Sequence, residues 1–398
     1  MLDISKITEK IPKIGKYLRQ EASANSQKLE RGRTILQEAQ KQQQNLIKKY
    51  YDWHQDLNFK TAIPVEPLDT CLNINCNSHD HSVFATDGSQ IVPSHHEIAY
   101  CYLINIGRVI LHYGKILHPL LESIPEVYYH PEDLNISRKW GIKTEEWLCY
   151  QRLILENQNL AQISCNWVDN LNNSTGHFLS IVDGPLTYWF LEGLSEEVHD
   201  LILEPIQEAW DKLKFFNIPL IGYVSSSSSI EGINFLRLHN CIFDNPDCVN
   251  NCNNFLKRQT PCQIIEPLKD ITLWGEILKP GQRGPLWKST ANILKSYKKK
   301  QHIYFCYINI GSEIARIEFP EWVAENSRLL NQALEIVFSQ VNKGFGYPIA
   351  LSEAHNQAVI HGRDRRHFFS MLERQMVQSG IRNVKTSYKE TRKRNSIA

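Results

Sequence analysis

An apolar run stops at a carboxylate and a glycine in Phe84-Ala85-Thr86-Asp87-Gly88-Ser89, and again in Leu179-Ser180-Ile181-Val182-Asp183-Gly184-Pro185. Apolar runs of this length are typical of buried strands, and a glycine permits a sharp turn after them. Each segment therefore predicts a strand that ends at an acidic side chain. Carboxylates at the ends of neighbouring strands can hold divalent cations for phosphodiester cleavage, whereas a single Asp-Gly is also an ordinary turn dipeptide.

The composition limits the class of protein. The 398 residues are 42% hydrophobic, which is enough for a large core, and the formal net charge is +1. Any contact with nucleic acid is therefore expected to come from local basic patches. No stretch approaches the ~20 consecutive apolar residues of a membrane span, and the N-terminus lacks the residue order of a signal peptide. We expect a cytoplasmic protein that does not enter a membrane, and its ten cysteines then need an explanation other than disulfides.

The order of the expected elements indicates a fold class. It is three strands, helix, strand, helix, strand, with these ranges: Ser82–Thr86; Glu97–Asn105 and Arg108–Tyr113, joined by a tight turn at Gly107; a helix over 143–164; Phe178–Val182; a helix over 195–215; and Leu220–Ser225. This order matches the α/β ribonuclease-H-like fold, in which an antiparallel meander is followed by parallel strands and the mixed sheet is flanked by helices.

The remaining segments predict a helical N-terminal arm over residues 1–60, a main domain over 80–378 and a basic tail over 379–398. A cysteine-containing insertion over 240–290 interrupts the main domain. After it we expect a hairpin of Ile303–Ile310 with Glu313–Glu318, and then two helices over about 320–342 and 350–378.

The two Asp-Gly motifs, in this order and on these elements, resemble the NurA nuclease family. The Asp-Gly-Ser motif is followed by the strand pair that contains Tyr102-Leu103-Ile104-Asn105-Ile106-Gly107. The segment Gly346-Tyr347-Pro348-Ile349-Ala350-Leu351-Ser352-Glu353-Ala354-His355 is similar to the closing motif of the family, in which a tyrosine precedes a histidine by eight positions. The resemblance covers roughly residues 80–225 and 303–375, and leaves the arm and the insertion unexplained.

The resemblance implies a ribonuclease-H-like core and a manganese-dependent nuclease, with Mg²⁺ as a possible substitute. Members of the family degrade DNA as 5′ to 3′ exonucleases with some single-strand endonuclease activity. They commonly act as dimers with a hexameric HerA-type translocase, an ATPase, in the repair of DNA breaks. Asp87 and Asp183 match the two metal-binding aspartates of the family. Glu156 fits the third carboxylate best, and Glu145 and Glu146 stay as alternatives.

Two further groups complete the expected site. The resemblance makes His355 a candidate metal ligand or proton shuttle, and Tyr347 a candidate donor to a phosphate or to water. Arginine binds phosphate through two parallel hydrogen bonds, so we expect Arg363, Arg365 and Arg366 to hold the DNA backbone. A solvated helix face is the other interpretation of these arginines.

Three other functions stay open. The strand at 220–225 often leads into a lysine-bearing segment in these nucleases, but here it leads into five serines, Ser225 through Ser229. The chain could therefore be a weakened subunit that binds DNA ends or anchors a translocase. An acidic site of this kind also serves nucleases that act on RNA or on hybrids. The N-terminal helix could instead make the chain a structural partner.

The insertion holds Cys241, Cys248, Cys252 and Cys262. Four thiolates could bind zinc or an iron–sulfur cluster, although the spacing is not the usual pair of Cys-x2-Cys units. Since the region has few apolar residues, a metal would help to hold it folded. The alternative is four buried or unligated thiols.

Overall fold

The computed structural model describes residues 3–8, 10–75, 80–94, 97–170, 176–252 and 260–381. The chain forms two compact units, which we describe separately: unit 1 comprises residues 1–75, 184–189 and 223–324, and unit 2 comprises 76–183, 190–222 and 325–398. Lys385, Lys389, Arg392, Lys393 and Arg394 of the predicted basic tail lie outside the described residues.

The sheet of unit 2 is mixed. Its strands follow the order β7-β6-β3-β4-β5, with the bounds β3 His81–Ile91, β4 Tyr102–Tyr113, β5 Leu120–Tyr128, β6 His177–Asp183 and β7 Leu220–Val224. The meander of β3, β4 and β5 is antiparallel, whereas β6 pairs with β3 in parallel. This arrangement confirms the predicted mixed sheet of the ribonuclease-H-like class.

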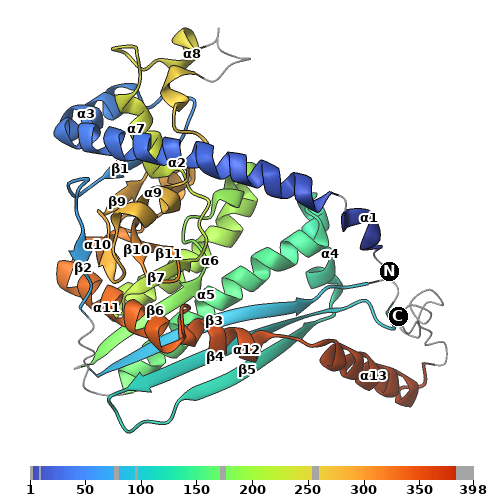
Figure 1. The fold of residues 1–398 in the computed structure, drawn as a ribbon. Helices are drawn as coiled ribbons and strands as arrows, with labels where there is room; N and C mark the ends of the chain where they lie inside the picture. Colours follow the sequence, from blue (N-terminus) through green and yellow to red (C-terminus); the bar gives the residue numbers. More distant parts are fainter. Residues whose placement is uncertain are drawn as a thin grey trace. The chain divides into compact units, whose positions relative to one another are not determined.

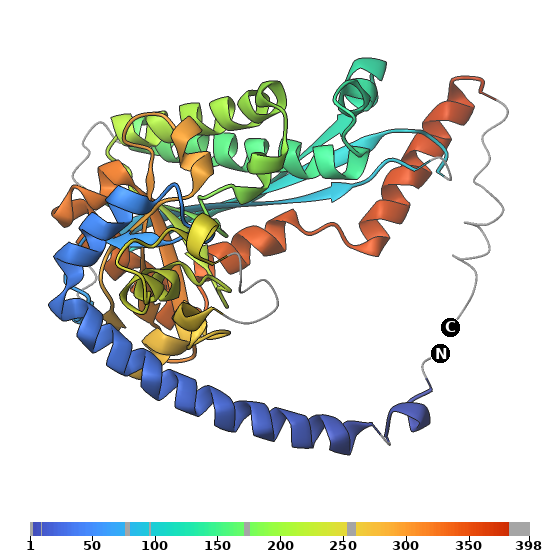
Figure 2. The ribbon, with the colours of Figure 1, turned by 90° about the horizontal axis from the view of Figure 1, so that it is seen from above.

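Helices cover both faces of that sheet (Figures 1 and 2). On one face α5 (Thr144–Asn170) packs on β3 and β4 and against α6 (Glu196–Phe215), and on the other face α12 (Ile349–Ala358) packs on the same strands. The rest of the unit contains α4 (Pro131–Lys139), α11 (Ser327–Lys343), α13 (Gly362–Gln378) and the short η1 (Trp189–Gly193), which begins in unit 1. Burial of apolar side chains on both faces, such as Phe84 and Leu179, holds these layers together.

Two of the predicted turns are wrong. Residues 87–89 stay in β3, with Asp87 opposite Gly107 and Gly88 opposite Ile106, and β4 runs without a break through Gly107. Both glycines serve packing instead of a turn. A Cβ on Gly88 would lie 2.6 Å from Glu156 Oε1, and one on Gly107 would lie 2.4 Å from the carbonyl oxygen of Ala354. The glycines therefore let helices approach the two faces of the sheet.

Other boundaries differ for physical reasons. The third meander strand is β5, which the sequence analysis did not assign; its burial pattern alternates between half-buried and exposed because one face of it is solvated. The predicted helix over 350–378 is two helices, α12 and α13, separated at residues 359–361. The predicted helix over 320–342 likewise splits into α10 (Glu321–Ala324) and α11.

Unit 1 has a second set of strands. They follow the order β1-β9-β10-β11, with β2 paired to β8 and β8 to β10. The bounds are β1 Ala62–Pro64, β2 Leu72–Asn73, β8 Gln282–Arg283, β9 Trp287–Ser289, β10 Ile303–Asn309 and β11 Ile314–Pro320. The antiparallel pairing of β10 with β11 confirms the predicted hairpin around Gly311, which has a φ of 92°.

Most helices of unit 1 come from the predicted arm and the predicted insertion, and α7, η4 and α10 flank the insertion. The described helices of this unit (Figure 1) are α1 (Ser5–Thr8), the long α2 (Ile11–Lys41), α3 (Gln43–Trp53), α7 (Glu231–His239), α8 (Cys248–Asn251), η3 (Pro261–Gln263), α9 (Asp270–Ile277), η4 (Asn292–Ser296) and α10. Ile35 of α2, Leu46 of α3 and Trp274 of α9 are buried in one shared core. The first half of α2 instead exposes its apolar residues, Ile11, Ile14 and Leu18.

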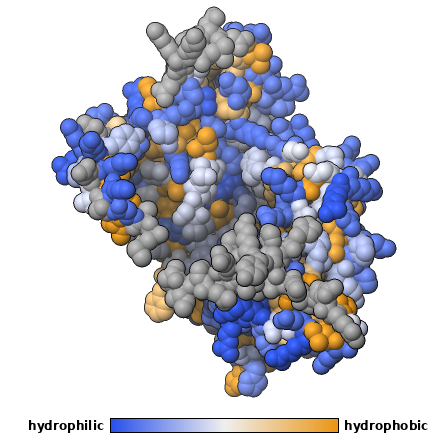
Figure 3. Space-filling view, turned by 90° about the vertical axis from the view of Figure 1, so that its right-hand side faces the viewer, coloured by the Kyte–Doolittle hydropathy of each residue, from blue (hydrophilic) through white to orange (hydrophobic). Residues whose placement is uncertain are grey.

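One face of the molecule is shown in Figure 3. Hydrophilic side chains predominate on the face shown in Figure 3, and the hydrophobic ones are scattered among the coloured atoms. Over the described residues, every helix is too short or too polar to span a bilayer.

Candidate active site

Asp87 lies on β3 just beyond the point where parallel pairing with β6 ends, at Ala85 opposite Ile181. Successive side chains of a strand point to opposite faces. Accordingly, Thr86 donates a hydrogen bond of 2.9 Å to the backbone carbonyl of Glu156 on α5, and Asp87 Oδ2 lies 2.8 Å from Nδ1 of His355 on α12. The strand therefore links both helix layers at the same position.

Glu156 approaches the strand from α5. Its Oε1 lies 3.2 Å from Arg152 Nε, one helical turn earlier, and its carboxylate accepts a hydrogen bond from the backbone N–H of Gly88. The pKa of Glu156 is raised to about 8: burial raises it most, Arg152 lowers it, and the negative charges of Asp87 and Asp183 raise it. Three acidic groups thus share one region with too little positive charge to balance them.

Asp183 is the last residue of β6. Gly184 follows with a φ of 110°, a conformation that glycine adopts without strain, so the predicted turn is present at this second Asp-Gly. Burial raises the pKa of Asp183, a hydrogen bond from the hydroxyl of Tyr347 lowers it, and the charge of Asp87 raises it. Tyr347 stands just before the first turn of α12.

The position of His355 depends on how α12 is docked. Asn105 Nδ2 donates to the carbonyl oxygen of Ala358 at 2.8 Å, and the hydroxyl of Ser89 donates to the same carbonyl. Ala350, Ala354 and Ala358 share the buried face of the helix, where their small side chains permit close contact with the sheet. The imidazole of His355, the residue after Ala354, lies beside this buried face, reaches Asp87 of β3 and is 66% exposed.

The structure thus brings together the five side chains predicted from sequence. They are Asp87 of β3, Glu156 of α5, Asp183 of β6, Tyr347 just before α12 and His355 within α12. Glu145 and Glu146 lie in the first turn of α5, more than two turns before Glu156, and Glu146 accepts a hydrogen bond from Tyr150. Arg152 was missed, although its spacing of four residues from Glu156 on a helix predicts contact.

The donor set suits a hard divalent cation, because it offers three carboxylates and an imidazole. As the side chains stand, however, no three His, Cys, Asp or Glu residues in the described ranges are grouped closely enough to hold a metal ion. Asp87 faces His355 while Glu156 faces Arg152 and Gly88. Binding a cation here would therefore require side-chain rotations.

Comparison with known proteins shows the family of this chain. The model of the NurA domain matches residues 81–360. The chain belongs to the NurA family. Its fold is similar to the crystal structure of the NurA nuclease from Sulfolobus solfataricus, with a TM-score of 0.50 and 10% sequence identity over 95% of this chain and 98% of that one. The search of curated proteins found no match.

A second solved structure aligns more loosely. It is the catalytic domain of human Endonuclease V, with a TM-score of 0.31 and 11% identity over 83% of this chain and 98% of that one.

The NurA domain match begins at the first residue of β3 and ends just after α12, so it contains all five gathered side chains.

The arginines predicted to bind DNA are not equivalent. All three lie in the first turns of α13, beyond the end of the NurA domain match. Arg363 and Arg366 are exposed. Arg365 Nη2 instead lies 3.1 Å from Oε1 of the buried Glu97, and its guanidinium lies 5.6 Å from the ring centroid of Phe369. Arg365 therefore anchors α13, and a role in DNA binding stays a prediction for all three.

The four cysteines of the predicted insertion come together in unit 1. Cys241, Cys248, Cys252 and Cys262 line one small cavity. The pKa of Cys252 is raised to about 11, first by burial and then by the nearby thiols of Cys248 and Cys262. The thiols are near one another, but among the described residues no three of them are grouped closely enough to hold a metal ion. A zinc or iron–sulfur site stays a prediction.

Proposed function

We propose that this member of the NurA family is a DNA nuclease that depends on a divalent metal ion, Mn²⁺ or Mg²⁺. The supporting observation is the convergence of Asp87, Glu156 and Asp183, with the 2.8 Å contact between Asp87 and His355. Three acidic groups in one region repel one another, which favours a bound cation. When bound, such a cation would neutralise the carboxylates and stabilise the negative charge that develops on a phosphodiester during hydrolysis.

The side chains of the chain itself have separate tasks in this proposal. Asp87 and Asp183 supply oxygen ligands, and Glu156 supplies a third after losing its proton. Tyr347 donates to Asp183 and so fixes the orientation of that carboxylate. His355, which is exposed and within hydrogen-bond distance of Asp87, can hold or pass a proton near the substrate.

From its membership of the NurA family, we further propose that the protein is a 5′ to 3′ exonuclease with single-strand endonuclease activity. It would act in the processing of DNA break ends. The same reasoning proposes a homodimer that works with a HerA-type hexameric ATPase. Co-purification with such an ATPase, and the mass of the protein alone in solution, test these two proposals independently of the chemistry.

Cleavage of end-labelled DNA tests the nuclease proposal. Single-stranded DNA, double-stranded DNA and RNA are each incubated with Mn²⁺, Mg²⁺ or a chelator. We expect metal-dependent cleavage of DNA, and a loss of about a thousandfold or more in Asp183→Asn, because roughly 4 kcal/mol of transition-state stabilisation disappears with the ligand. Cleavage of RNA in preference to DNA would instead favour a nuclease that acts on RNA or on hybrids.

The matched control is Asp169→Asn, which removes an exposed aspartate from the last turn of α5. It should cleave DNA at the wild-type rate. A folded Asp183→Asn protein that retained that rate would refute the proposed site.

A weakened subunit is the second candidate. The serines that replace the lysine-bearing segment of the family are bound to an acid, since Ser225 Oγ lies 2.7 Å and 2.8 Å from the two carboxylate oxygens of Glu313. This segment therefore presents a carboxylate where the family often has a cation. Wild-type protein that binds DNA ends but cleaves with none of the metals would support this candidate.

A further inference from the structure

Unit 1 contains a hollow of about 550 Å³ that the nuclease site does not use. It is lined by the end of α3, by the segment between α3 and β1, and by β9 with the residues that follow it. We call it the Lys288 pocket. Its volume lies within the ~300–1,000 Å³ that is usual for small-molecule sites. None of the five side chains of the candidate active site lines it.

The charged side chains that line the Lys288 pocket are basic, and Glu321 lies next to the lining, 3.9 Å from Nδ1 of His302. Lys60, Lys288 and Lys295 line it together with His54 and His302, and neither Asp nor Glu occurs among the described lining residues. This concentration stands out in a chain whose formal net charge is only +1. A concave surface lined by cations attracts anions and raises their local concentration.

Aromatic faces accompany these lysines. Lys60 Nζ lies 4.6 Å from the ring centroid of Trp189, and Lys288 Nζ lies 5.5 Å from that of Tyr304. Tyr51, in the lining itself, is 57% exposed. Cationic groups next to accessible aromatic rings are typical of sites that hold a phosphate and stack a base.

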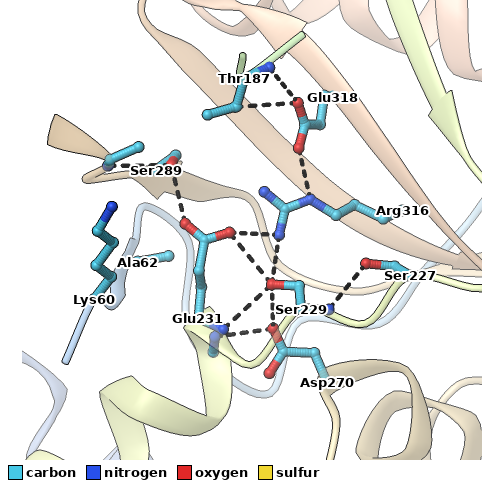
Figure 4. A network of polar contacts seen from close by, with 12 residues as sticks. Lys60, Ala62, Thr187, Ser227, Ser229, Glu231, Asp270, Ser289, Arg316 and Glu318 are labelled. Atoms are coloured by element: carbon cyan, nitrogen blue, oxygen red, sulfur yellow. Dashed lines mark hydrogen bonds and ion pairs between the residues drawn. The ribbon is translucent and has the colours of Figure 1, made fainter. Parts of the chain in front are cut away.

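The floor of the pocket is fixed by a buried polar network, shown in Figure 4. Ser289 Oγ donates to Glu231 at 2.9 Å, and Arg316 binds Glu231 at 2.7 Å and Glu318 at 2.8 Å. The hydroxyl of Thr290 donates to the carbonyl oxygen of Thr61 at 2.5 Å, which ties the two sides of the floor together. Because Ser289, Glu231 and Arg316 are buried with these bonds made, the floor is a stable platform for a ligand.

We propose that the Lys288 pocket binds a nucleoside phosphate, either as one unit of a nucleic-acid strand or as a free nucleotide. The lysines take the phosphate and Tyr51 takes the planar base. This binding needs neither a metal ion nor any residue of the acidic site. It is therefore independent of whether the chain cleaves DNA.

The first measurement is protection of lysines from an amine-reactive reagent, read residue by residue by mass spectrometry on the full chain in the presence of a chelator. The two probes are a single-stranded oligonucleotide and deoxyadenosine monophosphate. We expect severalfold protection of Lys288 and Lys295. Lys279 and Lys299, which are exposed in the same unit but do not line the pocket, serve as the internal reference.

The second measurement is binding of the labelled oligonucleotide over a range of salt concentrations. The double variant Lys288→Gln, Lys295→Gln should weaken binding and lower the salt slope by about 1.4, as expected for two lost contacts to a single strand. The double variant Lys279→Gln, Lys299→Gln carries the same change of charge and should behave as wild type.

The outcomes separate the two sources of the ligand. Protection by the oligonucleotide, with the weaker binding of the first variant, supports a strand. Protection by the monophosphate alone supports a free nucleotide. Absence of protection by both probes, or equal effects of the two double variants, would overturn the proposal, and neither result would alter the cleavage assay.

Discussion

A single glycine decides how the acidic residues meet. Gly88 has an extended backbone within β3, and its missing side chain leaves the space that Glu156 and Arg152 occupy. The sequence analysis placed Asp87 beside Glu156, but assigned Gly88 to a turn. A glycine in a turn and a glycine against a helix look identical in sequence, because the atoms that need the space lie far along the chain. Gly184, with its φ of 110°, is by contrast a glycine that the turn itself requires.

Glu156 makes the stability of the metal-free protein depend on pH. Its pKa is raised from 4.5 to about 8 in the folded state, first by burial. Between these values the folded protein holds a proton that the unfolded chain releases. The free energy of unfolding should therefore fall as pH rises from about 4.5 to 8. Urea unfolding at several pH values, in the presence of a chelator, measures this slope.

Glu156→Gln should flatten that part of the slope, because the amide does not titrate. The control Glu145→Gln changes an exposed residue in the first turn of the same helix and should keep it. A slope shared equally by all three proteins would show that Glu156 is not its source.

At the scale of elements, the docking of α12 on the sheet is the feature that the sequence could not supply. The motif around Tyr347 and His355 was recognised, and the helix after it was expected. That α12 lies against β4 at Gly107 depends on contacts between segments far apart in the chain, such as the hydrogen bond from Asn105 to Ala358. Periodicity reports the buried face of a helix, but not its partner.

Gly107→Ala tests this docking. The new Cβ would lie 2.4 Å from the carbonyl oxygen of Ala354 and 2.6 Å from the nitrogen of Ala358, so the backbone of α12 must shift. We expect a loss of about 1–3 kcal/mol in the free energy of unfolding, as for other overpacked sites. Cleavage should fall as well, since α12 carries His355. Urea unfolding and the cleavage assay measure the two effects.

The control is Gly193→Ala, because a Cβ at Gly193 would have open space around it. That variant should unfold at nearly the wild-type urea concentration. If Gly107→Ala did the same, the close approach of α12 to β4 would be in error.

At the scale of the whole molecule, the sequence predicted helices for residues 1–60 but not their burial. The run over residues 37–44 is polar apart from Ala39, so its composition does not indicate a buried helix. In the structure, Ala39 within that run is fully buried, and Leu46 and Tyr50 follow it into the core of unit 1. The core is completed by residues from the predicted insertion, such as Leu273 and Trp274. Two segments without a family resemblance thus stabilise each other.

This core predicts different results for two deletions. Removing residues 1–23 takes away only the part of α2 whose described apolar residues are exposed, so the melting temperature should change by no more than a few degrees. Removing residues 1–58 takes away Ile35, Leu36, Ala39, Leu46 and Tyr50 from the core. Each large side chain contributes roughly 1.5–3 kcal/mol, and the sum is comparable to the whole stability of a domain of about 5–15 kcal/mol. Unit 1 should then fail to fold, which calorimetry of the purified proteins would show.

The shorter deletion also isolates the exposed apolar positions of α2. If Ile11, Ile14 and Leu18 contact another subunit, the protein lacking residues 1–23 should lose its assembly while it unfolds and cleaves DNA as the full chain does. Mass in solution, measured beside calorimetry and cleavage, separates the two effects. Cooperative unfolding of the longer deletion at the wild-type temperature would mean that α2 and α3 are an independent arm, against the shared core described above.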